Sequence, residues 1–214
     1  MPRAAFSHVD TWVFDLDNTL YPPEIRLFDQ IEARMTAYVV RHLGVDSGEA
    51  DRLRASYWAD YGTTLAGLME VNGIDPDPYL DDVHDICFDA LTPDPDLASA
   101  IEALPGRKIV YTNGHGPYAE RVLAARGLAG LFSAVYGVEH ANYAPKPRET
   151  AFRTVFERDG LDPTRAAMFE DDARNLKIPK AMGLVTIHVA EASDPAPHID
   201  HRTADLATFL QGLL

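Results

Sequence analysis

The chain has 214 residues and a net charge of −14, from 33 acidic and 19 basic side chains, and 46% of its residues are hydrophobic. This length and composition predict a globular protein with a hydrophobic core, built as one domain or as one domain with a smaller insert. The negative charge argues against nucleic acids and anionic membranes as partners, because both attract basic surfaces. A small phosphorylated metabolite is compatible with it, since a bound divalent cation reverses the charge locally.

The single cysteine, Cys87, excludes an internal disulfide. It lies in an apolar helical pattern between Ile86 and Phe88, so we expect a small buried hydrophobic side chain. The first ten residues lack the apolar core of a signal peptide, and no stretch approaches the ~18 apolar residues of a membrane span. We therefore expect a cytoplasmic protein, and the sequence is compatible with either a monomer or a homodimer.

The first third of the chain combines one strand with a run of helices. Residues 11–16 form a short apolar run, rich in β-branched and aromatic residues, that is typical of a buried strand. Apolar residues at helical spacing, with glycine stops, then predict four consecutive helices. These helices are expected at residues 24–43, 47–61, 63–70 and 78–91.

The rest of the chain alternates between strands and helices. Strands are predicted at residues 108–112, 134–138, 166–169 and 184–189. Helices are predicted at residues 96–104, 117–126, 148–159, 173–182 (broken) and 203–213, and the Pro-rich residues 193–198 are expected to form a surface loop. This alternation indicates an α/β fold with a parallel sheet covered on both faces, in which ligands bind beyond the carboxyl ends of the strands.

Polar residues follow each of the first four core strands. In chain order the clusters are Asp15-Leu16-Asp17-Asn18-Thr19, Thr112-Asn113-Gly114, Ala144-Pro145-Lys146-Pro147, and Glu170-Asp171-Asp172 with Asn175. Each cluster alone has a structural explanation, such as an Asx turn, an Asn-Gly turn, a surface lysine or an acidic helix start. Their common position at strand ends favours a functional site.

The residue types at these positions suit phosphoryl chemistry. One carboxylate of a closely spaced pair can attack phosphorus while its neighbour moves protons. Thr112 and Asn113 can donate hydrogen bonds to phosphoryl oxygens, and Lys146, fixed between two prolines, can neutralise charge. The acidic run suits Mg²⁺, which proteins often hold through one or two carboxylates.

With these clusters in this order, the chain resembles the haloacid dehalogenase superfamily over nearly its whole length. The segment D-L-D-N-T matches the pattern of two aspartates and a threonine that is typical of the superfamily's phosphatases. The resemblance implies a doubly wound, Rossmann-like core made of residues 1–20 and 93–214. It also implies that residues 21–92 form an inserted, all-helical cap domain.

The resemblance also implies a role for each matching residue. Asp15 would be the nucleophile and a magnesium ligand, and Asp17 the general acid and base, with its backbone carbonyl on the metal. Thr112, Asn113 and Lys146 would bind the phosphoryl group, and Lys146 would also pair with Asp15. Asp171 aligns as the third protein ligand of Mg²⁺, and Glu170, Asp172 and Asn175 would hydrogen-bond to its ligands or reach the ion through water. Relatives often carry a small polar residue where Asp172 stands, so the choice of direct ligand between Asp171 and Asp172 stays open.

The motifs D-N-T-L-Y and F-E-D-D-A-R-N-L are most similar to the pyrimidine 5′-nucleotidase branch, which makes UMP or CMP the first substrate to test. Tyr21, Tyr57, Trp58 and Tyr61 are candidates for contacting the leaving group, although packing within a cap helix is the preferred interpretation of Trp58. The alternatives are a 2-haloacid dehalogenase, a sugar phosphomutase and a non-catalytic binding module on the same fold. A dehalogenase does not need the second acid, Asp17, and a binding module should have lost a catalytic residue.

Overall fold

A six-stranded parallel sheet forms the centre of the computed structural model, which describes residues 5–192 and 195–214. The strand order is β3-β2-β1-β4-β5-β6, so the first strand lies in the middle. The strands are β1 (Thr11–Phe14), β2 (Arg107–Tyr111), β3 (Ala134–Tyr136), β4 (Ala166–Glu170), β5 (Val185–Val189) and β6 (His201–Thr203). All four residues of β1 are buried, as expected for a central parallel strand that is covered on both faces.

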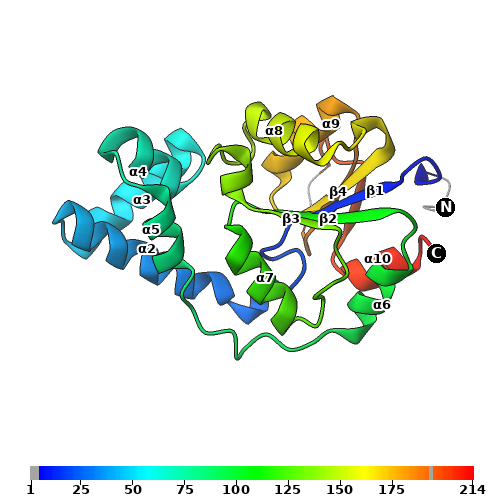
Figure 1. Cartoon of the computed structure of the whole chain (residues 1–214), viewed down its shortest axis with the longest axis horizontal. Coiled ribbons are helices and arrows are strands. Elements are labelled where there is room, and N and C mark those ends of the chain that lie inside the picture. Colours follow the sequence, from blue (N-terminus) through cyan, green and yellow to red (C-terminus); the bar gives the residue numbers. More distant parts are fainter. Residues whose placement is uncertain (1–4, 193–194) are drawn as a thin grey trace.

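Helices cover both faces of this sheet (Figure 1). One face packs against α8 (Glu149–Asp159) and α9 (Lys177–Met182), and the other against α6 (Pro95–Ala103), α7 (Gly116–Ala125) and α10 (Leu206–Gln211). Alternating side chains of β1 serve the two cores, since Val13 belongs to one hydrophobic cluster and Trp12 and Phe14 to the other. The predicted doubly wound α/β class is confirmed.

Four consecutive helices between β1 and α6 form a separate group, on the left of Figure 1. Local sequence signals set their ends. Asp46, Thr63 and Asp75 accept hydrogen bonds at helix starts, and Gly44, Gly62 and Gly73 end helices in the left-handed conformation. The helices are α2 (Leu27–Leu43), α3 (Ser47–Tyr61), α4 (Thr64–Asn72) and α5 (Pro76–Val83).

The fourth helix is shorter than predicted, and this changes the interpretation of Cys87. The helix α5 ends at Val83, and Cys87 lies exposed in the connection to α6. The Gln30 side chain bonds both the N–H and the carbonyl of Cys87, which satisfies an extended backbone without a helix. The prediction of a buried cysteine was therefore wrong.

The carboxyl-terminal region contains a strand that the sequence did not predict. β6 pairs with β5 and begins at His201, shortly after the residues 193–198 that were expected to form a surface loop. The broken helix is confirmed as the 3₁₀ segment Ala173–Leu176 followed by α9. Of the predicted loop at residues 193–198, positions 193 and 194 lie outside the described residues. Within residues 5–192 and 195–214, no helix is both long and apolar enough to span a membrane.

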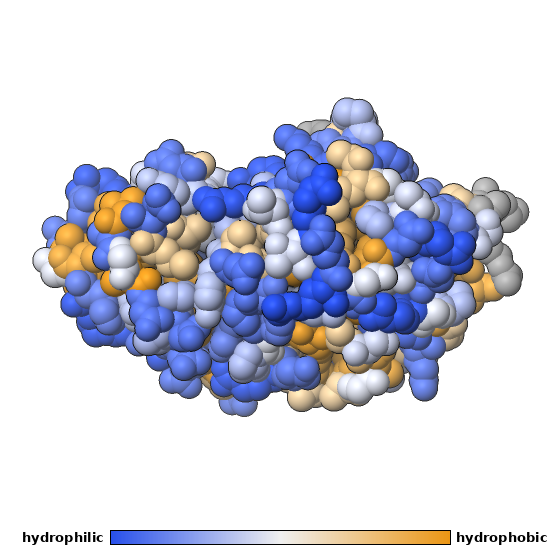
Figure 2. Space-filling model, turned by 45° about the horizontal axis from the view of Figure 1, so that its top comes forward, coloured by the Kyte–Doolittle hydropathy of each residue, from blue (hydrophilic) through white to orange (hydrophobic). Residues whose placement is uncertain are grey.

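The visible surface is mostly hydrophilic, with separate hydrophobic areas. Figure 2 shows hydrophobic residues over the group of helices α2 to α5 and also in the lower middle of the view. Three exposed large hydrophobic residues, Phe28, Trp58 and Val71, belong to this group. Phe28 and Trp58 also line the cavity described below.

Candidate active site

The carboxyl ends of β1 and β4 bring the predicted acidic residues together. Asp15 extends β1, and its N–H donates to the carbonyl of Phe169 at 2.9 Å. Glu170 is the last residue of β4, and Asp171 follows it. Because parallel strands end at the same edge of a sheet, segments more than 150 residues apart in sequence share one site.

Lys146 is a buried cation between two of these carboxylates. Its Nζ lies 2.7 Å from Asp15 Oδ1 and 2.6 Å from Glu170 Oε2, and it also donates to the Tyr111 carbonyl at 3.2 Å. Burial opposes the charge, but Asp15 and Glu170 outweigh it and raise the pKa of Lys146. The predicted pairing of Lys146 with Asp15 is present, and Glu170 is a second partner that sequence reasoning did not assign to it.

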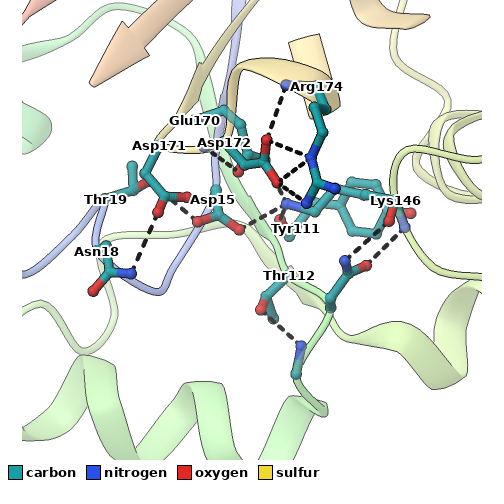
Figure 3. A network of polar contacts seen from close by, with 12 residues as sticks. Asp15, Asn18, Thr19, Tyr111, Thr112, Lys146, Glu170, Asp171, Asp172 and Arg174 are labelled. Carbon is teal, nitrogen blue, oxygen red and sulfur yellow. Dashed lines mark hydrogen bonds and ion pairs between the residues drawn. The ribbon is translucent and has the colours of Figure 1, made fainter. Parts of the chain in front are cut away.

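The acidic cluster fits a divalent cation. Asp15, Glu170 and Asp171 each offer a carboxylate oxygen, and these atoms lie within 4.8 Å of one another (Figure 3). Burial and the charge of Glu170 raise the pKa of Asp15 to about 7, and burial together with Asp15 raises the pKa of Asp171 to about 6. Three carboxylates and the single ammonium of Lys146 leave two negative charges, which one Mg²⁺ would balance.

The two neighbouring aspartates of the acidic run have different surroundings. Asp171 faces the cluster and accepts a bond from Asn18 Nδ2 at 3.3 Å. Asp172 instead caps the 3₁₀ segment and binds the Arg174 guanidinium through Oδ2 at 2.6 Å. Burial raises the pKa of Asp172, but the hydrogen bonds from Arg174 outweigh burial, and the net effect is a lowered pKa. The geometry therefore favours Asp171 over Asp172 as the direct metal ligand, while Asn175 lines the cavity beside them.

Thr112 and Asn113 lie at the end of β2 and line the same cavity. The Asn113 side chain is engaged with the backbone of Lys146, since its Nδ2 donates to the carbonyl at 3.2 Å and its Oδ1 accepts from the N–H at 2.8 Å. Thr112 Oγ1 accepts from the Gly114 N–H at 2.9 Å and keeps its own proton to donate. The Asn113 side chain thus fixes the backbone at Lys146 in this structure.

The Asp17 side chain does not belong to the group formed by Asp15, Glu170 and Asp171, and two tyrosines bind it instead. Its Oδ1 accepts hydrogen bonds from the hydroxyls of Tyr21 at 2.7 Å and Tyr118 at 2.6 Å. Burial raises the pKa of Asp17, whereas these two bonds lower it. Tyr21, predicted to contact the leaving group, is buried and does not line the cavity, and Tyr118 was missed because a tyrosine in an amphipathic helix has no distinguishing local signal.

A cavity of about 500 Å³ connects this site to the helical group. Trp58 lines it and is half exposed, with the guanidinium carbon of Arg174 4.0 Å from the centre of its ring. The preferred interpretation of Trp58 as a packing residue is therefore wrong. Tyr57 is buried and bonds Asn72, and neither it nor Tyr61 lines the cavity.

The chain is similar to known proteins in sequence and in fold. Over 226 aligned residues, the chain is 27% identical to phosphate metabolism protein 8 of Saccharomyces cerevisiae, covering 94% of this chain and 69% of that protein. It is 25% identical over 185 residues to the fructose-1-phosphate phosphatase YqaB of Escherichia coli, covering 83% of this chain and 94% of that protein. The structure superposes on a haloacid dehalogenase phosphatase from Thermococcus onnurineus with a TM-score of 0.64 at 18% identity, covering 96% and 98% of the two chains.

The fold and the cluster of strand-end residues define a hydrolase of the haloacid dehalogenase type. The model of the haloacid dehalogenase-like hydrolase family matches residues 9–183. The chain belongs to this family.

Proposed function

We propose that this chain is a magnesium-dependent phosphomonoesterase that acts through a phosphoaspartate at Asp15. The observation that carries the proposal is the environment of Asp15, a buried carboxylate at a strand end with Lys146 Nζ at 2.7 Å, facing a cavity of about 500 Å³. The phosphatase names of relatives agree with it.

The chemistry has two steps. An Asp15 carboxylate oxygen attacks phosphorus, the bond to the ester oxygen breaks, and Asp17 gives its proton to the departing alkoxide. Water then attacks the phosphorus of the acyl phosphate, Asp17 takes a proton from it, and inorganic phosphate leaves with Asp15 restored. Lys146 stays charged throughout and offsets the negative charge of the transferring group, with Thr112 and Asn113 as proposed phosphoryl donors.

The proposed metal ligands are Asp15, Asp171 and the backbone carbonyl of Asp17, with Glu170, Asp172 and Asn175 around them. A bound Mg²⁺ supplies charge neutralisation for the carboxylates and for the phosphoryl oxygens. The cluster of Asp15, Glu170 and Asp171 supports this assignment.

The proposed substrate is a small phosphorylated metabolite, with a pyrimidine nucleoside 5′-monophosphate as its finer form. Trp58 and Phe28 offer aromatic surface to the leaving group, and the polar side chains of Glu32, Asp51 and Arg54 also line the cavity. We propose further that residues 21–92 act as a cap over this cavity. We also propose that neither nucleic acid nor membrane is a partner, and that the protein is cytoplasmic.

Dehalogenase activity is less well supported than phosphatase activity, because a dehalogenase would not use the proton carrier Asp17.

The test is release of phosphate from p-nitrophenyl phosphate, UMP, CMP and fructose 1-phosphate, with Mg²⁺ or with EDTA. We expect turnover that requires Mg²⁺ and is abolished in Asp15→Asn, and a preference for UMP and CMP would support the nucleotidase form. Absence of turnover on every ester in the presence of Mg²⁺ would overturn the phosphatase proposal and favour the mutase or the binding module.

A further inference from the structure

Two tyrosines from distant segments converge on one oxygen of Asp17. Tyr21 follows the nucleophile segment directly, and Tyr118 lies on α7, 101 residues beyond Asp17. Both hydroxyls donate to Oδ1, at 2.7 and 2.6 Å, and both side chains are buried. An ordinary solvated carboxylate would be free to rotate, whereas this one is held in a single orientation.

The contact determines which oxygen of Asp17 can carry a proton. A carboxylate oxygen has two lone pairs, and the two tyrosines occupy both of those on Oδ1. A proton on Asp17 therefore resides on Oδ2. Asp17 lines the cavity and neither tyrosine does, so Asp17 is the member of this group that can meet a leaving group.

The surrounding fold holds Tyr118 in place. Its ring stacks on His84 at 4.3 Å between centroids, with 22° between the ring planes. The ring also lies close to Gly114, where an added Cβ would be 3.0 Å from Tyr118 Cδ1. Gly114 therefore leaves room for the ring beside Thr112 and Asn113, which gives a packing reason for a glycine at this position.

We propose that Tyr21 and Tyr118 are positioning residues that aim Oδ2 of Asp17 at the leaving-group oxygen. The proposal rests on the proposed phosphatase function, in which Asp17 protonates the departing alkoxide. The tyrosines keep their protons and touch neither the substrate nor the reacting atoms. Their contribution is the orientation of the group that transfers the proton.

The experiment compares two substrates that differ in their need for a proton. p-Nitrophenolate leaves readily without one, whereas the alkoxide of an alkyl phosphate such as β-glycerophosphate requires general acid catalysis. Values of kcat/KM, which report formation of the phosphoenzyme, are measured for wild type, Tyr21→Phe, Tyr118→Phe and the double variant. We expect the alkyl phosphate to lose at least about tenfold more than p-nitrophenyl phosphate, in keeping with the roughly 10²–10⁴-fold contribution of a positioned acid.

Two further variants separate this proposal from the one on which it depends. Asp17→Asn should show the same dependence on the leaving group, but larger. Tyr79→Phe is the matched control, because Tyr79 is also buried and its hydroxyl has no hydrogen-bond partner within the described part of the chain. It should leave both substrates unaffected.

The phenylalanine variants keep the aromatic rings, and thermal unfolding verifies that they fold. Equal losses on both substrates, or no loss in the double variant, would overturn the positioning role while leaving the phosphatase intact. A wild-type protein that hydrolyses neither ester, or an Asp17→Asn variant with no dependence on the leaving group, would instead refute the proposed function.

Discussion

Lys146 is the residue on which the charge balance of the site depends. Its side chain is 1% exposed and lies within hydrogen-bond distance of Asp15 and Glu170, so three charged groups share a space that water hardly reaches. Removing one partner of such a group leaves the others buried and uncompensated, which costs far more than breaking a surface ion pair. The lysine therefore serves both stability and the proposed chemistry.

We expect Lys146→Met to lower kcat by roughly 10²–10³-fold, because the variant lacks the fixed positive charge that would offset the negative charge of the transferring phosphoryl group. The free energy of unfolding should fall by about 3–5 kcal/mol. Urea denaturation and phosphate release measure the two effects.

The matched control is Lys180→Met, which removes a lysine that pairs with Asp200 at 2.6 Å but is 38% exposed. A surface ion pair contributes at most about 1 kcal/mol, so this variant should remain close to wild type in both measurements. Similar losses in the two variants would contradict the central role of the buried lysine.

At the residue scale, the sequence revealed those site residues that follow strands directly. Asp15, Thr112 and Glu170 could be predicted to lie together because a parallel sheet aligns strand ends. Tyr118 and Arg174 could not be placed, since their partners Asp17 and Trp58 lie more than 100 residues away and nothing local distinguishes these side chains. The exposure of Cys87 was mispredicted because local apolar spacing favours a helix there. In the structure, the Cys87 backbone instead forms its hydrogen bonds with the Gln30 side chain.

Among the elements, the turn into β2 depends on a glycine. Gly106 has a φ of +79°, and an added Cβ would lie 2.2 Å from the carbonyl oxygen of Asp10. The same carbonyl accepts the Arg107 N–H at 2.8 Å, which sets the start of β2 beside β1. A side chain at position 106 would therefore disturb the strand pair that carries Asp15.

Gly106→Ala should destabilise the protein by several kcal/mol, and Gly130→Ala provides a direct comparison. Gly130 has the same φ of +79°, with no atom within 4 Å of an added Cβ, so only the backbone strain of about 1–2 kcal/mol applies. The collision at Gly106 should add about 1–3 kcal/mol. Equal unfolding free energies for the two variants would show that the contact with Asp10 is relieved at little cost.

The end of α5 carries a buried histidine that makes stability depend on pH. His84 stacks on His115 and Tyr118, and burial, followed by the nearby His115, lowers its pKa to about 3. In the unfolded chain the pKa returns to about 6.5, so between these values only the unfolded state binds the proton. This contribution to stability is complete above about pH 6.5 and declines as the pH falls toward 3.

We expect wild type to lose about 2 kcal/mol more than His84→Phe when the pH is lowered from 7.5 to 5.0. Chemical denaturation at the two pH values measures the difference, and comparison between variants cancels the other titrating groups. An identical pH dependence in His84→Phe and wild type would mean that folded His84 takes up its proton over the same pH range as the unfolded chain.

Element boundaries were predictable wherever a local signal set them. The helix Ser47–Tyr61 was predicted with the observed ends, because Asp46 caps one end and Gly62 the other. β6 was missed because three residues beside a loop carry too little periodicity, and its strand character comes from pairing with β5. Tertiary contacts, rather than propensity, decide such short elements.

For the whole molecule, the net charge of −14 and the buried acidic cluster oppose folding in the same way. Like charges repel in the compact state, and the cluster of Asp15, Glu170 and Asp171 retains two negative charges after pairing with Lys146. A cation bound at this point would connect the ends of β1 and β4 and relieve the repulsion. Stability of the whole chain should therefore be linked to the metal.

We expect Mg²⁺ at about 100 times its dissociation constant to stabilise the folded protein by about 2.7 kcal/mol, which raises Tm by about 5–10 °C for a chain of this length. Differential scanning calorimetry in MgCl₂, against NaCl of matched ionic strength, separates specific binding from charge screening.

Asp171→Asn should abolish this rise in Tm, because it removes one of the clustered carboxylates. Asp172→Asn should preserve it, since that carboxylate is bound to Arg174 and an asparagine can still cap the following turn. Loss of the shift in Asp172→Asn with retention in Asp171→Asn would exchange the roles of the two residues, and no shift in wild type would remove the metal from the site.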